Sequence, residues 1–414
     1  MHLTAEDKSC LAGDRGEATR LAMRFLVAAG EAMQASRLID ITRCHLVGSY
    51  YAGEADLLLL RRFAALGAKV RVPTTLNASS ACLDSCSLNP QIDQEQAGLV
   101  VRLHEQLGCD PVLTCAPYHL PAPPVLGERI AWAESNAVTY ANSVLGARSN
   151  KTVQYLDLCA ALTGRIPEYG LYLDSARAPA LVIDCASIPS PFWDEPMHWE
   201  LLGLLLGYKC GSDIPLITGI DAEPTQDMLR SLSAAAASSG GMSMFHLAGI
   251  TPEAPLARVS ELQTTCVAAL PLSTDDLLNE LQPYAGSEGD AVSAICLGAP
   301  HYSLSQLSRL AEEVLSSAMR LKIPIYVTTS RYNLAQLQNT LQLGELRARG
   351  IFFLVDACSY YGQVIPKQTA GVMTDSAKWA YYAGGNLGVN AYLGSLENCI
   401  ETARQGRLVR GDRS

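Results

Sequence analysis

The chain has little positive charge and no long apolar run. Lysine and arginine together number 31 against 41 aspartates and glutamates, which gives a formal net charge of −10 at pH 7. This balance argues against nucleic acid or an anionic membrane as the main partner, although a local positive site could still hold an anionic substrate. The most apolar stretches, such as Leu201 to Leu206, are far shorter than the roughly 18–20 residues that a membrane-spanning helix needs.

Several short motifs are also missing. The first residues, Met1 to Thr4, lack the basic and then apolar pattern of a secretory signal. We therefore expect a cytoplasmic protein whose 13 cysteines are reduced thiols rather than a disulfide framework. No P-loop, H-E-x-x-H or G-x-S-x-G motif is found, so kinase, zinc-protease and serine-hydrolase activities have no support in the sequence.

Helical patterns alternate with short apolar runs along the chain. The apolar periodicity predicts helices over 17–33, 54–66, 303–319 and 334–349. The short runs predict strands at 38–41, 69–72, 111–114, 181–184, 214–218, 292–295, 324–327 and 351–355. Because the last three strands are separated by helices, they form a βαβαβ succession of parallel strands. The expected fold is therefore α/β with mainly parallel sheets.

Proline- and glycine-rich segments near 117–127, 188–196 and 283–289 are candidate hinges or long loops. We expect an N-terminal α/β region over 1–190, a middle region over 191–290 and a C-terminal region over 291–400. The charged residues 401–414 are expected to form a tail that frays beyond Gly406.

Three cysteines follow predicted strands. Cys115 comes after 111–114, Cys296 after 292–295, and Cys358 closely after 351–355. Ligands of open α/β sheets gather at the carboxyl ends of the strands, and thiolates suit zinc or iron–sulfur clusters. A cluster with three protein ligands leaves one iron open as a Lewis acid for a leaving hydroxyl. Position alone does not distinguish this hypothesis from cysteines that merely pack in the core.

A second arrangement of cysteines stays open. Cys82, Cys86, Cys109 and Cys115 could form a compact zinc site, although their spacing lacks the usual tight knuckle.

A polar stripe crosses the predicted helix over 130–148. Helical spacing places Ser135, Thr139 and Asn142 on one side. Such a stripe suits a helix that faces a buried polar site, and a helix that faces water is the alternative. Glu134 is a candidate general acid or base, metal neighbour or hydrogen-bond anchor. Arg148 could clamp a substrate carboxylate or simply pair on the surface.

Two further charged or titratable residues are weaker candidates. Lys378 could neutralise an anion, or it could be solvated. His301 follows an apolar run, where a lone histidine is more often structural than catalytic.

The stretch from Trp132 to Ala137, continued by Ala141 to Arg148, resembles the signature of aconitase X. Further segments that are similar to this family are Thr74 to Ser79, Cys115 to Tyr118, Cys296 to Gly298 with His301, and Asp356 to Tyr360. The resemblance spans most of the chain.

The resemblance implies α/β domains around an iron–sulfur cluster, 2Fe-2S or 4Fe-4S, with Cys115, Cys296 and Cys358 as ligands. It also implies a set of residues around the substrate. Candidate catalytic residues are Glu134 and His301; candidate substrate contacts are Asn77, Ser79, Ser135, Asn136, Arg148 and Lys378.

The implied activity is that of a hydro-lyase acting on a small hydroxy acid. Bacterial members of the family dehydrate cis-3-hydroxy-L-proline to Δ1-pyrroline-2-carboxylate, and archaeal members dehydrate phosphomevalonate. We expect the first reaction, because the composition lacks the Lys/Glu networks of hyperthermophiles and no phosphate cradle is visible. No swivelling fourth domain is recognisable after Gly394, so we expect a small partner subunit that supplies the base. A non-catalytic metal-binding or regulatory protein on the same scaffold is the alternative of another class.

Overall fold

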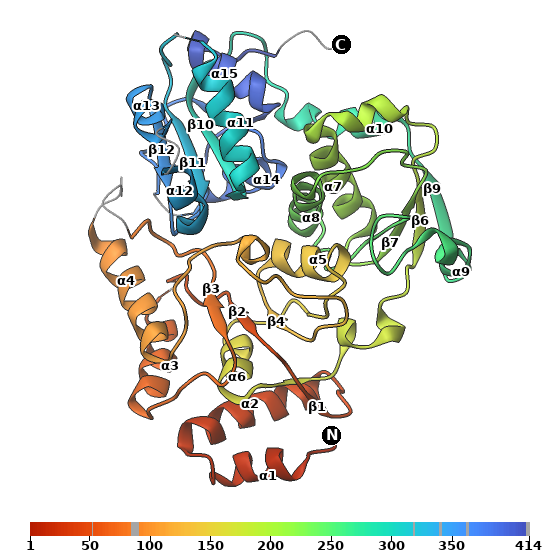
Figure 1. Cartoon of the computed structure of the whole chain (residues 1–414), viewed down its shortest axis with the longest axis vertical. Helices are drawn as coiled ribbons and strands as arrows, with labels where there is room; N and C mark the ends of the chain where they lie inside the picture. The colour runs from red at the N-terminus through yellow and green to blue at the C-terminus, as the bar shows by residue number, and fades with distance from the viewer. Residues whose placement is uncertain (52, 84–90, 318, 339–341, 362–363, 411–414) are drawn as a thin grey trace.

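Four sheets organise the chain in the computed structural model, which describes residues 1–410 apart from 52, 84–90, 318, 339–341 and 362–363. Three of these sheets are parallel, and the fourth is an antiparallel pair. Each parallel sheet is the centre of one unit, and the units follow one another along the chain (Figure 1). The expected α/β fold with mainly parallel sheets is confirmed.

The first unit contains the parallel sheet β3-β2-β4 and the antiparallel pair β1-β5. Its strands are β1 (Leu38–Asp40), β2 (Cys44–Leu46), β3 (Thr74–Leu76), β4 (Ala131–Trp132) and β5 (Arg165–Pro167). Its helices are α1 (Ala5–Ala12), α2 (Glu17–Ala32), α3 (Glu54–Ala65), α4 (Gln91–Gln106), α5 (Ser135–Ser143) and α6 (Leu156–Thr163).

The second unit contains the parallel sheet β8-β7-β6-β9. Its strands are β6 (Leu181–Asp184), β7 (Pro215–Thr218), β8 (His246–Leu247) and β9 (Ala268–Pro271). Its helices are α7 (Pro196–Cys210), α8 (Gln226–Ser239), α9 (Val259–Gln263) and α10 (Thr274–Asn279). The expected boundary at 190 falls inside this unit, because β6 pairs with β7 and β9.

The third unit contains the parallel sheet β12-β11-β10-β13-β14. Its strands are β10 (Val292–Tyr302), β11 (Ile325–Thr329), β12 (Ile351–Leu354), β13 (Gly371–Thr374) and β14 (Ala391–Leu393). Its helices are α11 (Leu304–Leu315), α12 (Arg331–Gln338), α13 (Gln342–Ala348), α14 (Ala377–Leu387) and α15 (Leu396–Gln405). Beyond α15 the chain does not fray at once, since Leu408 is fully buried.

Two predicted strands are wrong. Over 69–72 the backbone N–H groups of Val70 and Arg71 donate to carbonyls at Leu107 and Ala161, so the segment crosses other elements instead of joining a sheet. Over 111–114 the first residue is a proline without an N–H, and Leu113 has a positive φ of 44°, which an extended strand does not accommodate. Cys115 therefore lies on a loop.

Two further predicted elements differ in extent. The strand expected over 292–295 continues to Tyr302, so Cys296 lies within β10 rather than after it. The helix expected over 130–148 is shorter, because β4 takes its first residues and Glu134 forms the N-cap of α5. The cap arises because the Glu134 carboxylate accepts the N–H of Ala137, at 2.8 Å.

The three units surround α5. In Figure 1 the first unit lies below, the second to the right and the third at the upper left, with α5 between them. Helix α5 packs against α8 of the second unit, and eight of its nine residues are buried. None of the helices in the described part of the chain is long and apolar enough to cross a membrane.

Candidate metal centre

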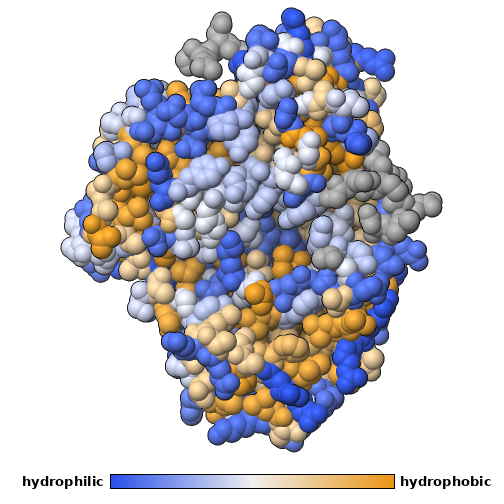
Figure 2. Space-filling view, turned by 180° about the vertical axis from the view of Figure 1, so that it is seen from behind, coloured by the Kyte–Doolittle hydropathy of each residue, from blue (hydrophilic) through white to orange (hydrophobic). Residues whose placement is uncertain are grey.

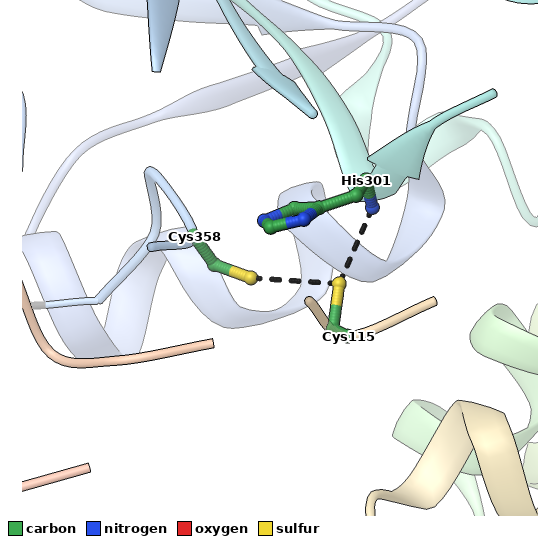
Figure 3. Close-up of side chains that lie close together, drawn as sticks. All are labelled: Cys115, His301 and Cys358. Atoms are coloured by element: carbon green, nitrogen blue, oxygen red, sulfur yellow. Dashed lines mark hydrogen bonds between the residues drawn. The ribbon is translucent and has the colours of Figure 1, made fainter. Parts of the chain in front are cut away.

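Three buried residues bring possible metal ligands together. Cys115, His301 and Cys358 offer ligand atoms that all lie within 4.8 Å of one another, and each residue is at most 2% exposed. Figure 3 shows the two sulfurs facing each other beneath the imidazole ring. The Sγ atoms are 3.8 Å apart, and the backbone N–H of His301 donates to the Cys115 sulfur at 3.2 Å. We call these three residues the thiol–imidazole group.

The His301 ring connects the two cysteine loops. Its Nδ1 lies 3.1 Å from the Thr114 hydroxyl, next to Cys115. Its Nε2 lies 3.0 Å from the carbonyl of Ala357, next to Cys358. Since both ring nitrogens are engaged, His301 would have to exchange a hydrogen-bond partner before it could bind a metal or move a proton.

The loop that carries Cys358 is held by Asp356. This residue has a positive φ of 72°, and its carboxylate accepts Nε of Arg331 at 2.7 Å. Its carbonyl accepts the N–H of Ser79 at 2.6 Å, so the loop after β3 is joined to the loop after β12. Two sequence-predicted segments therefore meet here although they come from the first and third units.

The electrostatics favour one thiolate and one thiol. Burial opposes ionisation of Cys115, but the hydrogen bond from the Cys358 thiol and the nearby His301 and Lys378 lower the pKa of Cys115 below its usual value. That donated hydrogen bond, together with burial, raises the pKa of Cys358. A thiolate in such surroundings is a good soft-metal ligand.

Two polar side chains beside the group have atoms without partners. Oδ1 of Asn77 and Oγ of Ser79 are buried and make no hydrogen bond within the described part of the chain. Ser79 also forms a β-bridge with Ala357, directly before Cys358. Buried polar atoms normally find partners, so unpaired atoms beside two thiols fit a centre that holds a metal and a polar ligand.

Cys296, the third predicted ligand, does not belong to the thiol–imidazole group. It is fully buried in β10, between Tyr326 of β11 and Thr374 of β13. Burial raises the pKa of Cys296, although a hydrogen bond with the Ser359 side chain opposes the shift. Ser359 directly follows Cys358, so Cys296 is connected to the thiol–imidazole group through Ser359. The role of Cys296 as a ligand stays a prediction.

Glu134 and Lys378 form a buried ion pair between the first and third units. Nζ of Lys378 lies 2.7 Å from Oε1 of Glu134, and the two side chains are 2% and 8% exposed. Burial opposes both charges, but each partner stabilises the other, so the pKa of Glu134 is lowered and that of Lys378 is raised. Both carboxylate oxygens of Glu134 accept hydrogen bonds, from Asn136, Ala137 and Lys378.

Asn136 joins this ion pair to Cys115. Its side-chain amide donates to the Cys115 carbonyl at 3.0 Å and to Glu134, and its Oδ1 accepts the hydroxyl of Tyr118 at 2.7 Å. The neighbouring Ser135 donates to Glu134 at 3.4 Å. The structure therefore brings together Cys115, Glu134, Ser135, Asn136 and Lys378.

The rest of the polar stripe has a structural use. The hydroxyl of Thr139 donates to the Met242 carbonyl at 2.8 Å, and the amide of Asn142 donates to the carbonyls of Ser149 and Ser243 at 2.9 and 3.0 Å. The stripe is buried against the second unit, so the alternative of a helix that faces water is wrong.

Arg148 is engaged elsewhere. Its guanidinium donates to the Tyr172 carbonyl at 2.9 Å and pairs with Asp174. The expected pairing at the surface is therefore what the structure shows for Arg148.

His45 is a buried residue that the sequence reasoning missed. It is the middle residue of the short strand β2, and its Nδ1 lies 2.8 Å from the Thr75 hydroxyl. Burial lowers its pKa to about 4, so the ring is neutral, although interactions with the Asn77 side chain and the Thr114 backbone oppose the shift. A three-residue strand gives almost no periodic signal, which is why the position was not predicted.

The zinc hypothesis gains no support from the described residues. Cys86 lies outside them. Cys82 and Cys109 are buried, and burial raises the pKa of Cys109 to about 12. Cys115 is grouped with Cys358 and His301 instead.

The molecular surface is hollowed across the middle of the face opposite to that of Figure 1. Hydrophilic residues gather around this hollow, and orange hydrophobic patches lie over the lower part of the molecule (Figure 2).

Comparison with known families gives a consistent result along the chain. Residues 1–175 match the aconitase X first domain, 179–279 the second domain and 292–405 the third domain. A solved structure of Thermococcus kodakaraensis aconitase X in its holo-form superposes with a TM-score of 0.87 at 31% identity, covering 97% of this chain and 100% of that one.

Curated relatives fall under two enzyme names. Cis-3-hydroxy-L-proline dehydratase of Pseudomonas aeruginosa is 36% identical over 99% of this chain and 71% of its own length. The enzyme of the same name from Hypocrea jecorina is 36% identical over 98% of this chain and 69% of its own. The phosphomevalonate dehydratase large subunit of Thermococcus kodakarensis is 33% identical over 97% of this chain and 100% of its own.

Proposed function

This chain belongs to the aconitase X family of dehydratases, and we propose that it carries the metal centre of a cis-3-hydroxy-L-proline dehydratase. The product would be Δ1-pyrroline-2-carboxylate. The observation that carries this proposal is the buried Cys115–Cys358 pair, 3.8 Å apart, beside the unpartnered polar atoms of Asn77 and Ser79. The 36% identity to two enzymes of that name supports the substrate.

We propose an iron–sulfur cluster, 2Fe-2S or 4Fe-4S, held by Cys115, Cys358 and Cys296. When bound, the cluster supplies a Lewis acid for a leaving hydroxyl. Cys115 and Cys358 face each other, and the lowered pKa of Cys115 favours its thiolate, the form that binds soft metals. For Cys296 to join them, its thiol would have to move from Ser359 toward the pair, while His301 keeps the two loops together.

The surrounding residues would bind and orient the substrate. Asn77 and Ser79 offer the unpaired polar atoms that can accept or donate hydrogen bonds to it. Ser135 and Asn136 begin α5, where backbone N–H groups favour a carboxylate. Lys378 supplies positive charge against the enolate-like charge that develops when the α-proton leaves.

We propose that the base comes from a small partner subunit. Both predicted catalytic residues of this chain are committed, because Glu134 accepts from Lys378 and Ala137 while His301 bridges Thr114 and Ala357. Similar chains are named large subunits, such as that of Thermococcus kodakarensis. The Pseudomonas aeruginosa relative extends beyond the matched part, which covers 71% of its length.

Metal analysis and an activity assay test the proposal. The chain would be purified without oxygen, alone and with its co-expressed small subunit, and assayed for iron, acid-labile sulfide and zinc. The expected result is iron with sulfide, and dehydration of cis-3-hydroxy-L-proline only with the subunit. Activity on phosphomevalonate instead would identify the other enzyme of the family. A metal-free, inactive chain would favour the alternative of a non-catalytic protein on the same scaffold. Zinc without sulfide would contradict the proposed iron–sulfur cluster.

A further inference from the structure

The second unit holds the segment that follows the thiol–imidazole group. This segment runs from His301 at the end of β10 to Gln306 in the first turn of α11. Arg230 of α8 reaches it with two hydrogen bonds: one to the His301 carbonyl at 3.1 Å, the other to the Gln306 side chain at 2.6 Å. Arg230 is only 2% exposed, so its charge is placed here at a large desolvation cost.

Asp227, one turn earlier in α8, holds the same segment. Its carboxylate accepts the hydroxyls of Ser303 and Ser305 at 2.8 and 2.6 Å, and it pairs with Arg230 at 3.4 Å. Ser303 and Gln306 form the capping box of α11. The start of α11 is therefore fixed both by its own cap and by two charged residues of another unit.

The space beside this contact is open. A cavity of about 480 Å³ lies between the second and third units, and its lining includes Arg230, Asp227, Ala299 and Tyr302. Side chains do not fill the region between the two units there, although Ala299 and Tyr302 near the end of β10 are themselves buried. The charged hydrogen bonds of Arg230 and Asp227 bridge the units at this edge.

His301 is where this contact meets the candidate metal centre. Its carbonyl accepts from Arg230, its N–H donates to the Cys115 sulfur, and its ring bridges Thr114 and Ala357. A rotation of the backbone at His301 would therefore change the distance between the two cysteine loops.

We propose that Arg230 is a positioning residue for the metal centre: it fixes the His301 backbone from the second unit and thereby sets the geometry of Cys115 and Cys358. This inference rests on the proposed metal centre. Arg230 touches neither thiol and needs no contact with substrate.

The test compares Arg230→Met, Arg230→Lys and Arg309→Met in the complex with the co-expressed small subunit. Arg309 is the matched control, since it lines the same cavity but pairs with Glu397 and not with the His301 segment. The measurements are iron and sulfide per chain, visible circular dichroism, kcat and KM, and the midpoint of thermal unfolding.

We expect Arg230→Met to alter the visible circular dichroism and to lower kcat about tenfold or more, as loss of charged hydrogen bonds does, with KM nearly unchanged. Arg230→Lys should restore part of both signals, and Arg309→Met should match the wild type. If Arg230→Met does not fold, Arg230→Gln takes its place with the same expected outcome, because it also removes the guanidinium that donates to the His301 carbonyl.

A folded Arg230 variant with the wild-type spectrum and kcat would overturn the inference. A lower unfolding temperature with an unchanged spectrum would also overturn it, because that is the result of a purely structural role. A wild-type protein without iron and sulfide would instead reject the proposed function.

Discussion

At the scale of single residues, the two facing thiols give the most direct prediction. Cys115→Ser and Cys358→Ser should each remove the visible absorption of the purified protein and its activity, because a serine hydroxyl is a poor ligand for iron. Iron and sulfide analysis with absorption spectroscopy measures this. Cys399→Ser is the control, since Cys399 is also fully buried in the third unit but lies outside the thiol–imidazole group. Full absorption in either test variant would contradict the assignment.

Cys296 needs its own experiment because its thiol contacts Ser359 instead of the other two sulfurs. If Cys296 is the third ligand, Cys296→Ser should abolish absorption and activity as the other two changes do. An intact brown protein after this substitution would show that Cys296 only packs in β10.

The ion pair between Lys378 and Glu134 predicts a stability effect. Lys378→Met should lower the free energy of unfolding by about 3–5 kcal/mol, because the Glu134 carboxylate is then buried without its partner. The double variant Lys378→Met, Glu134→Gln should recover much of the loss. Urea denaturation of the three proteins measures these differences. Equal stability of the single variant and the wild type would mean that the pair contributes no net stability.

At the scale of elements, a glycine decides how closely α7 and α8 approach. A Cβ at Gly203 would lie 2.6 Å from Ala235 Cβ and 2.7 Å from the Leu232 carbonyl, so neither helix could keep its position. Helix α8, which carries Asp227 and Arg230, therefore packs closely on α7.

We therefore expect Gly203→Ala to destabilise the protein by about 1–3 kcal/mol, as overpacking a core does. The control is Gly385→Ala in α14, where a Cβ meets nothing within 4 Å. That change should stabilise the protein by about 0.4–1 kcal/mol, because alanine restricts the unfolded chain. Thermal or urea unfolding measures both, and a neutral Gly203→Ala would show that the two helices can separate without cost.

At the scale of the whole molecule, a buried carboxyl links the second and third units. Glu200 of α7 accepts the N–H of Ala377, at the start of α14, at 3.0 Å. Burial and, to a smaller extent, the nearby Asp375 raise the pKa of Glu200 to about 7, although hydrogen bonds from Ser231 and Ala377 oppose the shift.

The raised pKa gives a pH dependence of stability. The folded protein holds the Glu200 proton more tightly than the unfolded chain, so stability from this group is complete below its ordinary pKa and is lost as pH rises toward about 7. The free energy of unfolding of Glu200→Gln, relative to that of the wild type, should therefore be higher at pH 8 than at pH 5. Unfolding curves at the two values measure this, and an unchanged difference would contradict it.

The elements with long periodic patterns could be predicted from the sequence. Helices α2, α3 and α11 begin at or within one residue of their expected starts, and the βαβαβ succession of the third unit follows from its alternating pattern. The strands predicted over 69–72 and 111–114 were wrong because the apolar residues of these segments pack without joining a sheet. Hydropathy does not distinguish such a packed segment from a strand. Strand β2 was not predicted, because three residues are too few to show a hydrophobic period.

The sequence by itself determined the α/β class and which soft side chains are available as ligands, because residue types and periodicity are local properties. Only the tertiary structure decided that Cys115 meets Cys358, 243 residues further along the chain, while Cys296 stays within β10. It also decided that Glu134 pairs with Lys378 and that Arg148 pairs with Asp174. Such pairings depend on how three units dock around α5, and no spacing within one segment encodes a distance between loops of different units.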